Sequence, residues 1–472
     1  MTSLQTVDAV VVYHGAVAAE NLVDWNSDLE GLYARMGRLF YRTESRRHAQ
    51  QYLQGLLAPL QRKNGWTMAE YVGEHEPKAL QRFLNLTPWS VDELVVLNRE
   101  YAMEILASPS AILVADPTGF AKKGKRSVGV QRQYSGTLGR VDNCQIATFL
   151  AYVTPGHDRV LLDRRLYLPK ESWLDDRERC AEAGVPADVT FKTRPEQVIE
   201  MIGATVAARV PFAWFTADEE FGQNPGLRTH LEKASISYVM AVPKNTTFVD
   251  TTGRDVQLNR LVPKLNHTAW ERRACGIGSK GFRVYDWVLM QSADPDHQYM
   301  IRKSIHDGEL AYYHCYNPRR AGFGELVNVA GARWPIEECF GSAKNEVGID
   351  QYQVRKYDAW HRHITLACWR TPSSPSPRTK RKKGLPRNRA TKPRAQYINH
   401  IREIRLATDN SSKPYRPHPR RNTPTHDRRH PEVGRRKPRT ALVKLATSAS
   451  NARPSSALPP PASAPGITDL AL

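Results

Sequence analysis

The sequence predicts an α/β fold with a helical N-terminal region and an inserted β-subdomain. Three observations predict it. Apolar residues recur at helical intervals across 29–108. From Pro109 the pattern changes to short apolar runs typical of buried strands, with helices between them. Residues 246–330 then interrupt this alternation with strand-like runs. A chain of 472 residues that is 40% hydrophobic is long enough for two or three domains.

The helical pattern of the N-terminal region is clearest at 52–57, 68–72 and 80–84. Ser90 is a predicted N-cap, and Glu93 is placed to complete a capping box. The region also holds a local basic set, which fits a solvated helical face and DNA contact equally well. Its members are Arg42, Arg46, Arg47, Arg62 and Lys63.

The α/β part is predicted from alternating strand and helix patterns. Strands are expected at 111–116, 128–134, 144–153, 159–167, 212–217 and 237–242, and helices at 174–183, 195–208 and 225–233. In the insertion, 282–290 and 310–316 have the composition of strands. Two of the expected core strands end in an aspartate, Asp116 and Asp218.

A third acid, Glu337, lies in a segment that is expected to be helical. There Arg333, Glu337 and Lys344 are spaced at i, i+4 and i+11, which places them on one helix face. By itself the segment is more typical of a surface helix with ordinary charge pairs. Carboxylates at strand ends and on a helix can, however, converge on one hard cation, usually magnesium. That arrangement is the core of two-metal phosphodiester chemistry.

The residues around these acids resemble DDE insertion-sequence transposases. The spacing of Arg333, Glu337 and Lys344 is that of the tyrosine-arginine-glutamate-lysine signature of this family. Ala330 stands where the signature tyrosine would lie, so one phosphate or flipped-base contact is expected to be missing. The resemblance runs from about Phe40 to Ala367. Further matching segments are 116–124, 127–137, 143–145, 166–169, 216–222 and 362–367.

The resemblance implies a ribonuclease H-like catalytic domain in two parts, 109–245 and 331–368. The β-subdomain 246–330 would be inserted between them, and the helical region 1–108 would bind transposon-end DNA. It also implies that Asp116, Asp218 and Glu337 are catalytic and hold two Mg²⁺ ions, which Mn²⁺ can replace. Arg333 and Lys344 would clamp DNA phosphates.

The implied reaction is cleavage at insertion-sequence ends followed by strand transfer to target DNA. The expected partners are double-stranded DNA, at the transposon ends and the target, and a second copy of the chain in a homodimeric DNA complex. The expected location is the bacterial cytoplasm, at the nucleoid. The alternative function is that of a catalytically inactive, DNA-binding transposase remnant.

A basic loop follows the first aspartate. Lys122, Lys123, Lys125 and Arg126 form either a charged hairpin turn or a phosphate-contacting loop, and the nearby aspartate favours the second. Other acids are neighbours of the proposed ligands and are alternative or supporting ligands; these are Glu219, Glu220 and Glu338. His361 and His363 are expected to be structural rather than catalytic.

Charge and cysteine content add two limits. Residues 369–472 hold 24 of the 68 Lys and Arg but only 5 of the 48 Asp and Glu, so nearly all of the net charge of +20 lies there. Bulk charge therefore does not predict DNA binding by the rest of the chain. The six cysteines show no metal-ligand spacing and are typical of reduced core thiols. No apolar run is long enough to span a membrane.

The segment 369–472 is expected to be a disordered basic tail, because it is rich in Pro, Ser, Arg and Lys and has almost no apolar periodicity. A solvated arm and a non-specific DNA-binding arm both fit this composition. A frameshift fits better. Read one base earlier, the codons from Cys368 onward permit an apolar run that resembles the helix found here in similar transposases.

Overall fold

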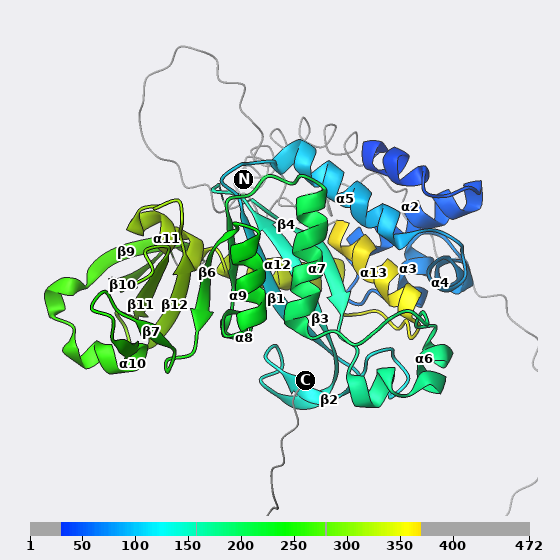
Figure 1. Ribbon diagram of the computed structural model, residues 1–472. Helices are drawn as coiled ribbons and strands as arrows, with labels where there is room; N and C mark the ends of the chain where they lie inside the picture. The colour runs from blue at the N-terminus through cyan, green and yellow to red at the C-terminus, as the bar shows by residue number, and fades with distance from the viewer. Residues whose placement is uncertain (1–29, 157, 279–280, 370–472) are drawn as a thin grey trace, which may run out of the picture. The chain divides into compact units, whose positions relative to one another are not determined.

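The computed structural model describes residues 30–156, 158–278 and 281–369 (Figure 1). Apart from Trp369, which ends the helix α13, the tail expected at 369–472, with its proposed frameshift, lies outside the described residues. So do the first 29 residues of the N-terminal region.

The N-terminal region is helical, as its apolar spacing predicts. Residues 30–37 form a helix, followed by α2 (Thr43–Leu57), α3 (Gly65–Tyr71), α4 (Lys78–Asn85) and α5 (Val91–Leu106). Ser90 caps α5 by accepting a hydrogen bond from the backbone N–H of Glu93 at 3.1 Å. Phe83 stacks on Trp89 with ring centroids 5.4 Å apart, which joins the end of α4 to the start of α5.

A mixed sheet forms the centre of the molecule. Its first six strands are β1 (Ile112–Ala121), β2 (Gln131–Ser135), β3 (Arg140–Val153), β4 (Arg159–Leu166), β5 (Trp214–Ala217) and β6 (Ser237–Val242). The core order is β4-β3-β1-β5-β6, with antiparallel pairing from β4 to β1 and parallel pairing from β1 to β6. This is the strand order of a ribonuclease H-like domain, and the α/β fold class predicted from the sequence is confirmed.

The inserted strands continue this sheet. They are β9 (Glu271–Gly278), β10 (Gly281–Gln291), β11 (His297–Lys303) and β12 (Leu310–Tyr316). β12 pairs antiparallel with β6, so ten of the described strands belong to one sheet (Figure 1). A small separate sheet contains β7 (Thr247–Val249) and β8 (Asp255–Gln257). Two helices in the same region were not expected, α10 (Leu258–Leu261) and α11 (Phe323–Gly331).

Helices cover both faces of the core sheet. One face carries α7 (Arg194–Ala207), α8 (Glu219–Gly222) and α9 (Pro225–Lys233). The other face carries α11, α12 (Trp334–Ser342) and α13 (Tyr357–Trp369). Side chains alternate along β1 accordingly: Leu113 and Ala115 face the first layer, and Ile112 and Val114 face the second.

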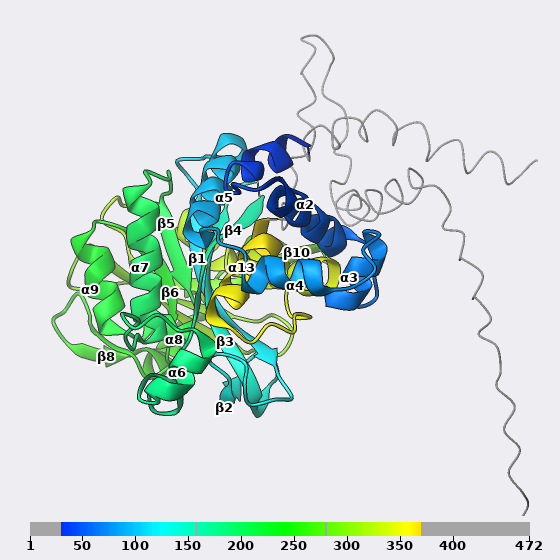
Figure 2. The same ribbon diagram turned by 90° about the vertical axis from the view of Figure 1, so that its right-hand side faces the viewer.

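The helix α13 joins the N-terminal helices to the sheet. Figure 2 shows α13 lying between the sheet and α2 and α4. Its His363 Nδ1 lies 2.7 Å from the Tyr52 hydroxyl of α2, and its Arg362 donates to the carbonyl oxygens of Leu84 and Trp89. His363 and Arg362 are thus structural, as predicted for the histidine. The N-terminal helices therefore pack onto the sheet domain through buried polar contacts at α13.

Several predicted elements have different limits in the structure. The strand predicted at 111–116 continues past Asp116 to Ala121, because its second half also pairs with β3. The strand expected at 128–134 begins only at Gln131, because the backbone N–H of Val128 donates to Arg355 at 3.0 Å outside the sheet. The helix expected at 174–183 is divided. A π-helical turn covers Lys170–Leu174, and α6 (Arg177–Ala183) starts after Asp176, whose side chain caps it.

All six cysteines are buried, as expected of core thiols. Among the described helices, none combines the length and the apolar character needed to cross a membrane.

Candidate active site

Asp116 and Asp218 come from neighbouring parallel strands. Ala115 of β1 pairs with Ala217 of β5, and each aspartate is the next residue of its chain. Successive side chains of a strand point to opposite faces of the sheet. By this rule both carboxylates point to the face that α12 covers. Asp218 also caps α8, accepting a hydrogen bond from the backbone N–H of Phe221 at 3.4 Å. The topology therefore brings together two acids that are 102 positions apart in the sequence.

The helix α12 presents Arg333 and Glu337 to the same face. Phe340 fastens this helix to the sheet by an edge-on contact with Phe149 of β3, with centroids 5.3 Å apart. An Arg333 nitrogen lies 2.9 Å from a carboxylate oxygen of Glu337. The Glu337 side chain is 47% exposed, so it stands at the open side of the group.

The electrostatics show that these groups act on one another. Burial raises the pKa of Asp116 to about 7, with further contributions from Asp218 and Glu337. Burial also raises the pKa of Asp218. Burial by itself lowers the pKa of Arg333. The negative charges of Glu337, Asp116 and Asp218 have a larger effect together, so the pKa of Arg333 is raised. The site therefore concentrates negative charge in a place poorly solvated by water, which favours a bound cation.

Lys344 reaches β1 from the turn that follows α12. This turn, Ala343–Val347, is π-helical rather than α-helical, so the single helix face predicted from Arg333 to Lys344 is interrupted. The ammonium group of Lys344 donates to the Thr118 hydroxyl at 2.8 Å. Thr118 lies two residues beyond Asp116 on the same strand and face, so Lys344 is beside the acids despite the change of helix type.

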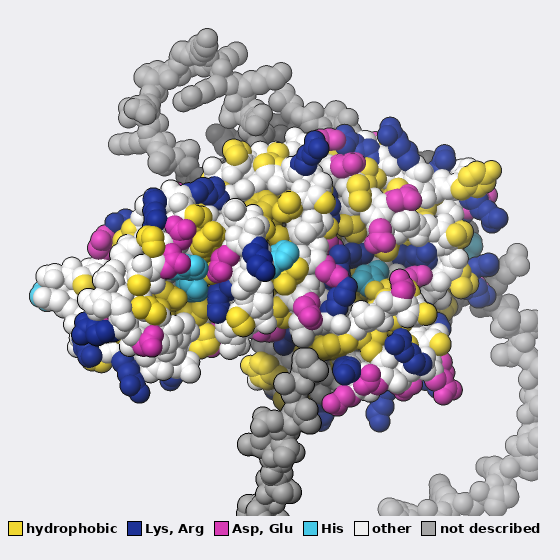
Figure 3. Space-filling view, in the orientation of Figure 1, with side chains coloured by type: hydrophobic (Ala, Val, Ile, Leu, Met, Phe, Trp, Pro, Cys, Tyr) yellow, Lys and Arg dark blue, Asp and Glu magenta, His cyan; other side chains and the backbone are white. Residues whose placement is uncertain are grey.

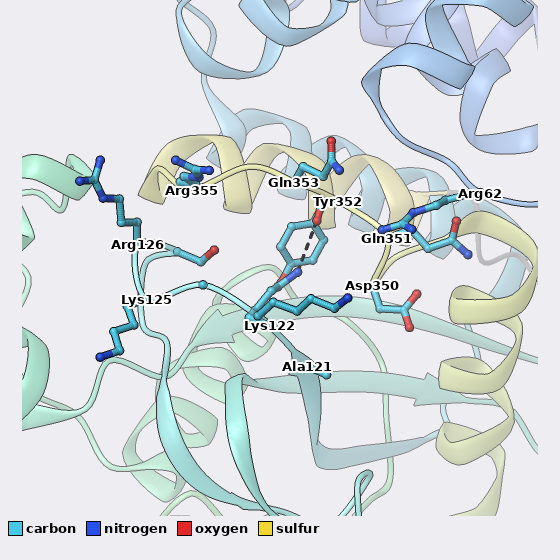
Figure 4. A pocket seen from close by; sticks show the side chains of 13 residues that line it. Arg62, Ala121, Lys122, Lys125, Arg126, Asp350, Gln351, Tyr352, Gln353 and Arg355 are labelled. Carbon is cyan, nitrogen blue, oxygen red and sulfur yellow. Dashed lines mark hydrogen bonds between the residues drawn. The ribbon is translucent and has the colours of Figure 1, made fainter. Parts of the chain in front are cut away.

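The basic residues of the loop after β1 differ in their exposure. Lys122 is packed inward, with its ammonium group 3.4 Å from the centroid of the Tyr352 ring, and burial lowers its pKa to about 8. Lys123, Lys125 and Arg126 are exposed and line a cavity of about 560 Å³ (Figure 4). The four residues therefore cannot share one role.

The neighbouring acids are paired with arginines. Glu220 lies 2.6 Å from Arg194, and Glu338 lies 2.9 Å from Arg159. Glu337 is itself paired with Arg333, but it also contributes to the raised pKa of Asp116, and Glu338 is not among those contributions. Glu337 is therefore the better candidate of these two for a metal ligand. Sequence reasoning missed the segment 350–355, which lines the cavity beside the basic loop. The sequence signal available for this segment was that polar residues surround a single aromatic residue, Tyr352.

The donor chemistry fits a hard divalent cation. All three candidate ligands are carboxylates, and oxygen ligands are those that Mg²⁺ prefers. Within the described ranges, no group of three or more His, Cys, Asp and Glu side chains is already spaced to hold a metal ion. The Glu337 carboxylate is paired with Arg333 in this structure. This ion pair is a physical reason why Glu337 is not grouped with the two aspartates as a ligand set.

Comparison with known proteins agrees with this geometry. A family model described as "DDE superfamily endonuclease" matches residues 35–257. A second family model, described as "Transposase DDE domain", matches residues 182–369. Together they cover the segments that carry all three acids. A probable transposase for insertion sequence element IS701 from Microchaete diplosiphon is 26% identical over 314 residues, which are 64% of this chain and 75% of the relative. Enzymes of this family generally use divalent metal ions. The two family matches, which together span residues 35–369, and the insertion-sequence relative support a DDE-type transposase.

Proposed function

We propose that the protein cuts DNA at the ends of an insertion sequence and joins the freed end to target DNA. The observation that carries this proposal is the convergence of Asp116, Asp218 and Glu337 on one face of the sheet around Arg333. The similarity to a probable insertion-sequence transposase supports the same reaction class. The substrate is double-stranded DNA. We propose a homodimer in the DNA complex, located in the bacterial cytoplasm at the nucleoid.

The three carboxylates would hold Mg²⁺, with Mn²⁺ as a substitute. When bound, such ions supply an activated water at neutral pH and neutralise charge on the phosphate that is attacked. Glu337 would complete the ligand set, and its exposed position leaves it free to turn from Arg333 toward the aspartates. Buried Asp116 and Asp218 gain most from a cation, because both carry charge in a poorly solvated place.

Two basic residues would position the DNA. Arg333 is held among the acids, where its planar guanidinium can accept a phosphate as Glu337 turns away. Lys344 is held over β1 by Thr118 and would meet a phosphate next to the one that is cut. Both residues would fix the DNA strand against the carboxylates without forming a covalent link to it.

The test is cleavage and joining of DNA that carries the element's own ends, with Mg²⁺ or Mn²⁺. Replacing Asp116, Asp218 or Glu337 by Ala should abolish cleavage and leave DNA binding intact. Glu338→Ala is the matched control, because this neighbouring carboxylate is paired with Arg159 instead. Wild-type cleavage by any of the three variants, or loss of cleavage in the control alone, would remove the assignment.

The second candidate, an inactive DNA-binding remnant, is favoured by the unusual composition that begins after α13. Residues 359–368 of α13 are all buried. A frame-restored chain would continue with an apolar helix, so we expect it to transpose better than the present chain. If restoring the frame changes nothing, while deletion of 369–472 abolishes activity, then the tail is a functional arm and the frameshift proposal is wrong.

A further inference from the structure

Two adjoining cavities form a basic surface at the end of β1. The first, about 560 Å³, lies between the loop that follows β1 and the segment 350–355 (Figure 4). The second, about 360 Å³, shares Lys125, Arg126 and Arg355 with the first. We call the joint surface the basic trough. Its charged members are Arg62, Lys122, Lys123, Lys125, Arg126, Arg179, Arg355 and Lys356, with the acids Asp350 and Glu182.

The walls of the trough are fixed by hydrogen bonds between distant segments. The backbone N–H of Val128 donates to the carbonyl of Arg355 at 3.0 Å, which ties the loop to the segment after α12. Arg179 stacks over the Trp173 ring at 3.9 Å and donates to the carbonyl of Lys125 at 2.9 Å. The backbone is therefore held in place before any ligand binds, which lowers the ordering cost of binding.

The basic heads are exposed while the walls are rigid. Lys125, Arg126, Arg355 and Lys356 are all exposed, and Figure 4 shows Arg126 and Arg355 on the same side of the cavity. On the face that Figure 3 shows, basic and acidic side chains are interspersed. Lys122 and Arg179 are held against Tyr352 and Trp173, whereas the other six basic residues of the trough are exposed. Against two acids, this local excess of positive charge fits a polyanion.

The distance between the trough and the acids can be derived from β1, because this strand contains Asp116 and ends next to Lys122. Lys122 lies six positions after Asp116, and a strand rises about 3.4 Å per residue, so the trough begins roughly 20 Å from Asp116 along the direction of β1. Lys344 lies between them, over Thr118. Phosphates of one DNA strand are about 3.4 Å apart along the helix axis, so for a duplex lying along β1 roughly 20 Å corresponds to about six base pairs.

We propose that the basic trough binds the phosphate backbone of duplex DNA about six base pairs from the bond that is cut. The distance to the cut bond rests on the proposed function, whereas binding of the DNA backbone by the trough does not. The trough would hold the duplex in line with the carboxylates through Lys344, and its contacts would be independent of DNA sequence.

The first experiment measures binding of the full chain to a duplex of arbitrary sequence, without divalent metal, as a function of salt. The variant Lys125→Gln/Arg126→Gln/Arg355→Gln should lower the slope of log K against log salt by about 2.7, since each lost phosphate contact contributes about 0.9. Lys233→Gln/Arg260→Gln/Lys264→Gln removes the same charge from exposed residues outside the trough. A slope change that is equal in the two variants, or absent from the first, overturns the proposal.

The second experiment locates the contact. Methylphosphonates placed one at a time along a cleavable end should weaken binding of the wild type about four to eight nucleotides from the cut bond. This interference should vanish in the trough variant and persist in Asp116→Asn. Interference that is the same in the trough variant and the wild type overturns the proposal. If the wild type binds with a trough-dependent salt slope but never cuts, the proposed function fails and the trough still stands.

Discussion

At the scale of single residues, the site combines acids that are costly to bury with one arginine that stabilises them. Asp116 is only 9% exposed, and its neighbours Asp218 and Glu337 carry the same charge. Such a group is kept for function rather than stability, because an apolar or neutral residue in its place would avoid the cost of burial. Stability and activity should therefore respond in opposite directions to neutralisation.

Asp116→Asn is expected to abolish cleavage and to raise the thermal unfolding temperature in the absence of divalent metal. The amide keeps the shape of the carboxylate but removes a buried charge, and one pKa unit corresponds to about 1.4 kcal/mol. Thermal unfolding in EDTA at pH 8 measures the effect, with Glu338→Gln as the control outside the buried group. A lower unfolding temperature for Asp116→Asn would mean that its charge is needed for folding.

Lys344→Ala is expected to weaken DNA binding more at low salt than at high salt. Loss of one phosphate contact lowers the slope of log K against log salt by about 0.9. Thr118→Val serves as a companion variant, because it removes the hydroxyl that holds the Lys344 ammonium group but retains the charge. An unchanged salt slope for Lys344→Ala would show that this residue is only a structural neighbour of Thr118.

At the scale of elements, the sequence predicts which strands and helices exist better than it predicts how they end. The apolar runs that end at Asp116 and Asp218 place both acids correctly at the strands, because buried strands need continuous apolar residues. The π-helical turn at Ala343–Val347 has no such local signal. It depends on Gly348, which adopts a left-handed backbone conformation, and on packing between Lys63 and the end of the turn.

Lys63 is the clearest case of an element contact that the sequence could not show. It was grouped with exposed basic residues, but its side chain is buried, and its ammonium group donates to the carbonyl oxygens of Ala58 and Glu346 at 2.9 and 2.8 Å. These bonds connect the N-terminal helices to the turn that carries Lys344. A charge run gives no information about such a contact between residues almost three hundred positions apart.

Lys63→Met is therefore expected to destabilise the protein by roughly 2–4 kcal/mol, because two buried carbonyl oxygens lose their donor. Arg62→Met is the matched control, since this neighbouring residue is exposed and its loss should change stability by about 0.5 kcal/mol or less. Urea unfolding of both variants provides the measurement. Equal stability of the two variants would contradict the role assigned to Lys63.

At the scale of the whole molecule, three buried histidines stabilise the fold only while they are neutral. Burial lowers the pKa of His363 to about 3 and lowers those of His314 and His361 well below the usual value. In the unfolded chain each would titrate near 6.5. Below that pH the unfolded state binds more protons than the folded state, so stability is lost as the pH falls. Asp116 acts in the opposite direction, because its pKa is raised by burial.

His361 is the best of the three histidines for testing how a buried neutral histidine makes stability depend on pH. It packs against the rings of Tyr357 and Trp360, and its Nε2 atom is buried without a hydrogen-bond partner. His361→Phe keeps the ring contacts and removes the proton-binding group. The loss of unfolding free energy between pH 6.5 and pH 5 should therefore be smaller than in the wild type by about 1.4 kcal/mol per pH unit. Urea unfolding at several pH values measures this, with exposed His75→Phe as the control. If His361→Phe and the wild type lose stability equally on acidification, the folded protein protonates His361 without cost, and its acid sensitivity arises elsewhere.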